Sequence, residues 1–151
     1  MNSMNDTEIV AGTATGRTNR THRLRRLAGF GFVATLGAMV ATTLAAALAQ
    51  AVGVDFQVPD GGETIPLSGF AVVTGFFSVV GIVIAVALLR WSDRPATRFV
   101  WTAVSLTAIS LIPPLLSEAN TATVTALLGL HLVPATVMIP TLARSLRSRT
   151  D

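Results

Sequence analysis

The stretch TIPLSGFAVVTGFFSVVGIVIAVALL, residues 64–89, contains no charged residue. A membrane-spanning helix needs about 20 mostly apolar residues to cross a hydrocarbon core of about 30 Å, so this stretch is long enough to cross once. Two more uncharged stretches, 27–54 and 99–117, and a segment that begins at 119 and stays apolar to about Ala143 repeat the pattern. The sequence therefore predicts an all-α fold, a four-span transmembrane helical bundle with spans at about 27–52, 65–89, 99–117 and 121–143.

The composition of the whole chain agrees with this prediction. Of the 151 residues, 51% are hydrophobic and only 13% are charged, and the mean hydropathy is +0.63. An ordinary soluble domain has about 25% charged residues. We therefore expect the lipid bilayer to be the main partner, in the inner (plasma) membrane of a bacterium. All eleven basic residues are arginine, which is typical of a high-GC genome.

The arginines also indicate an orientation. They lie before the first span, between the second and third spans, and after the fourth, whereas the other two links have none. Because basic residues accumulate on the cytoplasmic side, an up-down topology with both termini in the cytoplasm is expected. Trp91 and Trp101 flank the same inner loop, where indole rings favour the headgroup level. Arginines that flank spans are topology signals, so the pI of about 11.3 does not indicate nucleic-acid binding.

Three regions follow from these boundaries. Residues 1–23 are expected to form a disordered, basic cytoplasmic tail, residues 24–146 the transmembrane domain, and residues 147–151 a second cytoplasmic tail. An alternative for the first span is a signal peptide cleaved near Ala47-Leu48-Ala49. The apolar run is longer than the roughly 7–15 residues of a typical signal-peptide h-region, so a retained span is preferred.

The outer loop between the first two spans, GVDFQVPDGGET at 53–64, has its own pattern. Val54, Phe56 and Val58 alternate with polar residues, which predicts a short extended piece lying over the bundle. The loop acids lack the dense oxygen spacing of a calcium loop, so we expect no metal site there. They are Asp55, Asp60 and Glu63.

Two local patterns concern helix packing and helix starts. In the inner loop, Asp93 is a candidate N-cap and Pro95 fits the first turn of the next helix. The first span carries a small residue at every fourth position, which favours close packing with another helix, either within the monomer or between two copies. These residues are Gly37, Ala41, Ala45, Ala49 and Gly53.

The fourth span holds one histidine and two prolines in the sequence GLHLVPATVMIP, residues 129–140. His131 falls near the bilayer midplane, where an ionisable side chain should face protein or a water-filled cavity. Pro134 has no amide hydrogen, so the Leu130 carbonyl loses its helical donor. We therefore predict a polar recess that opens outward. Its candidate residues are His131, Glu118, Ser110, Thr107, Ser78 and Thr43, and the candidate helix kinks are Pro113, Pro114, Pro134 and Pro140.

The link SEAN, the turn PDGGE before IPLSGF, the RW and RP dipeptides, and HLVPATVMIPTLAR at the end of the fourth span also carry a resemblance. Over about residues 24–148 the chain resembles a group of small four-helix membrane proteins from high-GC bacteria, known only as a domain of unknown function. The resemblance implies the four-span layout and no activity, so no site residue is carried over from it.

Three classes of function remain to be weighed. A non-enzymatic structural or interaction subunit, with a second copy or another membrane protein as partner, fits the small-residue pattern best. A small proton-linked transporter or ligand-binding protein using His131 is the alternative, although residues 27–54 lack the acid that small multidrug exporters carry in their first span. An enzyme is disfavoured because the spans hold no carboxylate to orient a histidine. We expect no cofactor: the chain has no cysteine, and His22 lies in the tail, far from His131.

Overall fold

The protein was examined as a computed structural model that describes residues 4–57, 64–117 and 119–147, with backbone alone for 4–20. Within these ranges the chain forms helices α1 (Met4–Ala51), α2 (Leu67–Trp91), α3 (Pro95–Ser110), α4 (Ile112–Leu116) and α5 (Thr121–Arg147). Four segments are long and apolar enough to cross a membrane: Thr21–Ala51, Leu67–Trp91, Pro95–Leu116 and Thr121–Arg147. The prediction of an all-α chain with four membrane-spanning helices is confirmed.

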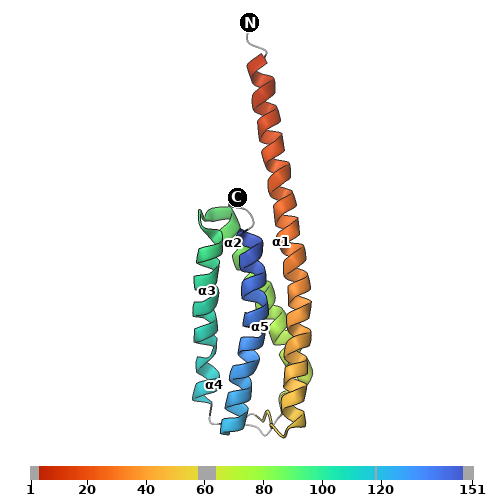
Figure 1. Ribbon diagram of the computed structural model, residues 1–151, viewed down its shortest axis with the longest axis vertical. Helices are drawn as coiled ribbons and strands as arrows, with labels where there is room; N and C mark the ends of the chain where they lie inside the picture. Colours follow the sequence, from red (N-terminus) through yellow and green to blue (C-terminus); the bar gives the residue numbers. More distant parts are fainter. Residues whose placement is uncertain (1–3, 58–63, 118, 148–151) are drawn as a thin grey trace.

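The helices lie side by side along one long axis (Figure 1). α1 packs against α2 and α5, and α3 packs against the same two helices on the other side. The order around the bundle is therefore α1, α2, α3, α5, with a further contact between α2 and α5 across the middle. The links after α2 and after α4 are only a few residues long, and each joins helices that run in opposite directions.

The N-terminal segment differs from the expected disordered tail. Residues 4–23 continue α1 as helix, and this part extends well past the end of the bundle (Figure 1). A helix that is already nucleated by a membrane span adds residues at low cost. No proline interrupts residues 4–51, so nothing in the backbone forces α1 to begin later.

The small residues named above face the bundle interior only in part: Ala45 and Ala49 are half-buried and pack against the cluster of Ala46, Phe56 and Leu130. Gly37 and Gly53 are exposed, and a β-carbon at either position would meet no atom within 4 Å. α2 approaches α1 closely at Gly31, where a β-carbon would lie 2.8 Å from Ile82 Cγ1. A different row of small residues is buried along α1, again repeating about every four residues: Gly31, Thr35, Ala38, Thr42 and Ala46.

The outer loop folds back onto the end of the bundle. Phe56 is completely buried, and its ring meets Phe70 edge-on with centroids 4.9 Å apart. The Ile65 amide donates to the Phe56 carbonyl at 2.9 Å, and the Thr123 hydroxyl donates to the Asp55 carbonyl at 2.6 Å. These contacts connect the loop to both α2 and α5. The extended piece is therefore short, and it places the Phe56 side chain in the interior at the end of the bundle. Val58 lies outside the described residues.

Both short links place a polar residue where a helix begins, but not always the predicted one. The Asn120 side chain accepts a hydrogen bond from the Thr123 amide at 2.9 Å, which caps α5. At the start of α3 the N-cap is Arg94, without a side-chain cap, so the expectation for Asp93 is wrong. Pro95 lies in the first turn as predicted. Because α3 begins at Pro95 itself, the N-cap is the residue just before it, Arg94, and not Asp93.

Candidate functional site

Three of the four hydroxyl groups of the predicted polar recess bond within their own helices. Thr43 donates to the Met39 carbonyl at 2.8 Å, and Thr107 donates to the Ala103 carbonyl at 2.8 Å. Ser110 donates to the carbonyl of Thr107 at 2.7 Å. Such local bonds satisfy a hydroxyl in an apolar environment without a partner on another helix. These three residues are therefore half-buried polar groups, and the hydrogen bonds that their hydroxyls donate stay within their own helices.

His131 is half-buried and lies roughly 15 Å along α5 from its start at Thr121. Its Nδ1 lies 2.8 Å from the Leu127 carbonyl, one turn back on the same helix. Because a carbonyl only accepts, Nδ1 carries the hydrogen in this bond, and in the neutral ring Nε2 is then an acceptor. The ring is held by its own helix, and one nitrogen can still accept a hydrogen bond.

The other two recess candidates have different positions. Ser78 is buried on α2, with 5% of its surface exposed, on the same side as the buried Thr74 and Ala85. Glu118 lies outside the described residues, so the predicted mouth of the recess is not part of the described structure. Of these two candidates, the structure therefore describes only Ser78, which lies in the bundle interior.

The four prolines act in two ways. α3 ends at Ser110, and after Leu111 the short helix α4 carries Pro113 and Pro114 near its start. These two prolines have no amide hydrogen, so the helical ladder cannot continue unbroken through them. In α5, by contrast, the helix runs without interruption through Pro134 and Pro140. Neighbouring helices can support a membrane helix across such a missing bond.

Thr42, the neighbour of the predicted recess residue Thr43, is a buried polar residue that the sequence analysis did not single out. It is 2% exposed, and its Oγ1 has no hydrogen-bond partner in the described part of the chain. Thr43 next to it is half-buried and bonded to its own helix. A signal was present in the sequence, because small residues flank Thr42 one turn away on each side, at Ala38 and Ala46.

A groove lies between α3 and α5, with a volume of about 530 Å³. Its polar groups are already used: the Thr107 hydroxyl donates to Ala103, and the Thr136 hydroxyl donates to Val133 at 2.8 Å. The groove is therefore apolar in its chemistry and suits apolar side chains or acyl chains. The remaining lining is Val104, Ala108, Leu111, Leu132, Ala135, Ile139 and Pro140.

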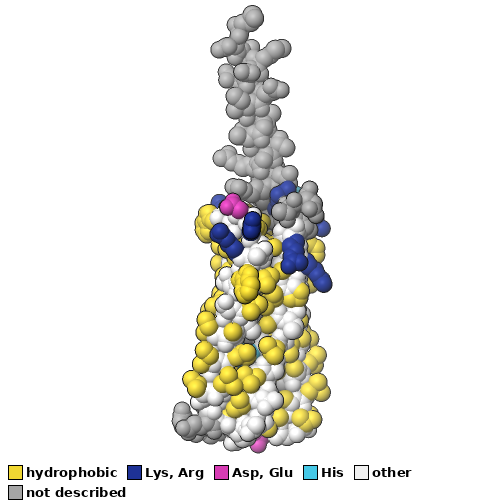
Figure 2. Space-filling model, turned by 60° about the vertical axis from the view of Figure 1, so that its left-hand side comes forward, with side chains coloured by type: hydrophobic (Ala, Val, Ile, Leu, Met, Phe, Trp, Pro, Cys, Tyr) yellow, Lys and Arg dark blue, Asp and Glu magenta, His cyan; other side chains and the backbone are white. Residues whose placement is uncertain are grey.

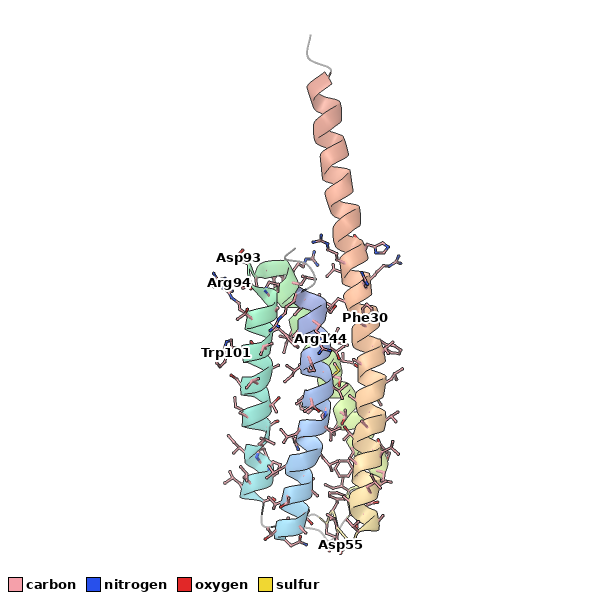
Figure 3. The ribbon with its side chains drawn as sticks, viewed as in Figure 1. Phe30, Asp55, Asp93, Arg94, Trp101 and Arg144 are labelled. Atoms are coloured by element: carbon pink, nitrogen blue, oxygen red, sulfur yellow. The ribbon has the colours of Figure 1, made fainter. Side chains whose placement is uncertain are left out.

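Charged side chains gather at the end of the bundle from which the long N-terminal part of α1 extends, above a largely apolar body (Figure 2). Arg94, Arg144 and Asp93 lie at this end in Figure 3, whereas Asp55 lies at the opposite end. Near the same end, Arg26 stacks over the Phe30 ring at 5.6 Å, and Trp101 is 70% exposed. Among the described residues there is no group of three or more histidine, cysteine or acidic side chains that could hold a metal ion. Asp60 and Glu63 lie outside those residues.

Comparison with known proteins adds one finding. A model of a family of unknown function, DUF6069, matches residues 22–148. The chain belongs to the DUF6069 family. The match covers all four membrane-capable segments of this DUF6069 member almost completely, from the start of Thr21–Ala51 to the end of α5. Neither the curated proteins nor the solved structures give a match. The family has no known function, so any role has to be argued from the chain itself.

Proposed function

We propose that this DUF6069 member is a multi-pass protein of the bacterial inner (plasma) membrane that acts as a non-enzymatic structural or interaction subunit. The observation that carries the proposal is the apolar outer surface of its spans. Large apolar side chains point outward from every one of them, including Leu44, Phe76, Leu106 and Leu132, which are 47–64% exposed. Lipid tails or another membrane helix would cover such a surface.

The geometry of the polar groups supports an interaction role over catalysis. A catalytic hydroxyl needs a base within hydrogen-bond reach and a third group that orients the base. Here the hydroxyls of Thr43, Thr107 and Ser110 donate to backbone carbonyls of their own helices. The apolar groove between α3 and α5 is lined partly by alanine and threonine, and small residues of this kind let a second helix approach closely.

The distribution of arginine supports an orientation with both termini in the cytoplasm. The exposed residues Arg90, Arg94 and Arg98 lie in or beside the link between α2 and α3, and Arg144 and Arg147 end α5. The opposite links carry no basic residue. By the positive-inside rule, the arginine-rich end faces the cytoplasm.

Single cysteines test this orientation, because the natural chain has none. We expect a membrane-impermeant maleimide to label Gln57→Cys and Thr121→Cys on intact spheroplasts. Asp93→Cys should react only after the membrane is opened. All three side chains are exposed, so a difference between them reports the side of the membrane rather than burial. Labelling of Asp93→Cys before opening would reverse the proposed orientation.

The interaction role is tested by photo-crosslinking in cells at native expression level. We expect a photoreactive residue at Leu132, in the groove between α3 and α5, to form a discrete crosslink to a protein. Phe76 on α2 is the matched control, because it is also exposed but does not line the groove. A crosslink that resolves as twice the chain mass indicates a second copy, and another mass indicates a different membrane protein.

Crosslinks to lipid alone at both positions, and at Leu36 and Leu106 on the other spans, would contradict an interaction role. The alternative of a small proton-linked transporter or ligand-binding protein would then be preferred. It is supported by the half-buried His131, whose Nε2 can accept a hydrogen bond while Nδ1 is held by Leu127. Proton flux in liposomes with His131→Ala is the measurement that follows from that outcome.

A further inference from the structure

Thr42 differs from several other threonines of the membrane-spanning helices, because its side-chain oxygen is buried without a hydrogen-bond partner among the described residues. Five of these other threonines donate to the carbonyl four residues earlier, at distances of 2.6–2.9 Å. Thr42 could make the same bond to Ala38, but its Oγ1 has no partner among the described residues although only 2% of the side chain is exposed. The Thr42 hydroxyl therefore lacks the bond to its own helix that these threonines make. The five bonded threonines are Thr35, Thr43, Thr107, Thr125 and Thr141.

The members of the two hydrophobic clusters indicate which part of α5 lies at the level of Thr42 along the bundle. Ala46 and Leu130 belong to one cluster, and Ala38 and Met138 belong to the other. Thr42 is one turn from each of the two alanines on α1. Because α1 and α5 run in opposite directions, the residue at the matching level of α5 lies between Leu130 and Met138 (Figure 1). That residue is Pro134, one turn from each of them.

Pro134 leaves an acceptor without its helical donor at this level. It has no amide hydrogen, so it cannot donate to the Leu130 carbonyl as another residue would. Leu130 is itself buried, with 6% of its surface exposed. A carbonyl of a buried residue without its helical donor and a buried hydroxyl without a partner each cost free energy.

We propose that this level of the bundle, between Thr42 on α1 and Pro134 on α5, is a binding site for a structural water molecule. The water donates one hydrogen to the Leu130 carbonyl and exchanges a second hydrogen bond with the Thr42 hydroxyl. Buried waters commonly bridge otherwise unsatisfied groups in this way, with about two to four hydrogen bonds each. A cation or anion does not fit, because neither neutral group would compensate its charge, and an apolar ligand would leave both groups unsatisfied.

The site gives the continuity of α5 at Pro134 a physical explanation. Ordered water is one of the ways in which a proline-containing membrane helix satisfies its freed carbonyl. The site is independent of the proposed interaction role, because it lies inside the bundle and not on its outer surface.

The test compares the melting temperatures of Thr42→Val and Thr42→Ser in lipid nanodiscs, each in the natural chain and with Pro134→Ala. Valine has the shape of threonine without the hydroxyl, so it should lower Tm by about 4 °C where the water is bound. Serine keeps the hydroxyl and should change Tm less. With Pro134→Ala, residue 134 donates to Leu130 directly, so Thr42→Val should then have little effect or raise Tm. An equal fall in Tm in both backgrounds, or no fall in either, would overturn the proposal.

Water-edited solid-state NMR gives a second readout that does not depend on stability. Magnetisation transferred from water should reach positions 42 and 130 in the natural chain and in Thr42→Ser. This transfer should be lost in Thr42→Val. Thr43 is the internal control, because its hydroxyl is already bonded to Met39. Absence of the water signal at Thr42 in the natural chain would mean that no water is bound there, and the proposal would be wrong.

Discussion

Phe56→Ala is expected to lower the free energy of unfolding by about 3–5 kcal/mol, which is the usual cost of removing a fully buried phenylalanine. Phe56 has no exposed surface, and it joins the cluster formed by Ala46 and Leu130 while its ring packs on Phe70. The loop that carries it lies at the end of the bundle, where the unfolded loop would meet water, so the full hydrophobic contribution applies. Chemical or thermal unfolding in nanodiscs measures the change.

The matched control for Phe56 is Phe77→Ala on α2. Phe77 is 65% exposed and pairs with Phe76 on the outer face of the helix. Its removal exchanges one lipid-facing apolar surface for another, so a change within about 0.5 kcal/mol is expected. Faster hydrogen exchange at residues 54–57 should accompany Phe56→Ala alone. Equal effects of the two substitutions would mean that the loop does not hold the end of the bundle.

The four membrane-capable helices could be predicted because span length and charge are properties of the linear sequence. An uncharged stretch such as 64–89 has the right length for one crossing, whatever it packs against. The role of Pro95 in starting α3 follows from local backbone geometry in the same way. Asp93 shows the limit of such local rules, since the chain places the N-cap at Arg94 and the Arg94 amide contacts the Ser92 hydroxyl at 3.3 Å instead.

The side chains that meet inside the bundle were less predictable, because their contacts depend on neighbouring helices and not on the local sequence. Depth counting finds which residues share a layer, but not which way each hydroxyl turns. Thr43 and Thr42 lie at nearly the same depth, yet one is bonded to Met39 and the other is buried without a partner. The choice depends on the neighbouring helices, which the sequence of one helix does not specify. The same holds for His131, whose Nδ1 bonds to the Leu127 carbonyl of its own helix and is therefore not available to a partner on another helix.

Packing faces on α1 show this limit most clearly, because two rows of small residues have nearly the same period. One row includes Gly37 and the other includes Gly31, and of these two glycines only Gly31 meets α2 closely. A repeat of four residues indicates that a smooth face exists, but it does not say which neighbour the face meets. A substitution at each glycine can therefore separate packing inside the bundle from the intrinsic effect of changing glycine in a helix.

Gly31→Val is expected to destabilise the protein by about 1–3 kcal/mol through overpacking. A β-carbon at this position would lie 2.8 Å from Ile82 Cγ1 and 2.9 Å from Cδ1, so α1 and α2 must separate or Ile82 must take another rotamer. Gly37→Val is the control, because its β-carbon meets nothing within 4 Å. Both changes favour the helix by about 0.4 kcal/mol, because valine has a higher helix propensity than glycine. The difference between the two changes in stability therefore isolates packing. Gly31→Ala should lie in between, since the end of Ile82 is flexible. If Gly37→Val were the more harmful change in nanodiscs, the face through Gly37 would be the one that packs, and the contact between α1 and α2 would have to be reassigned.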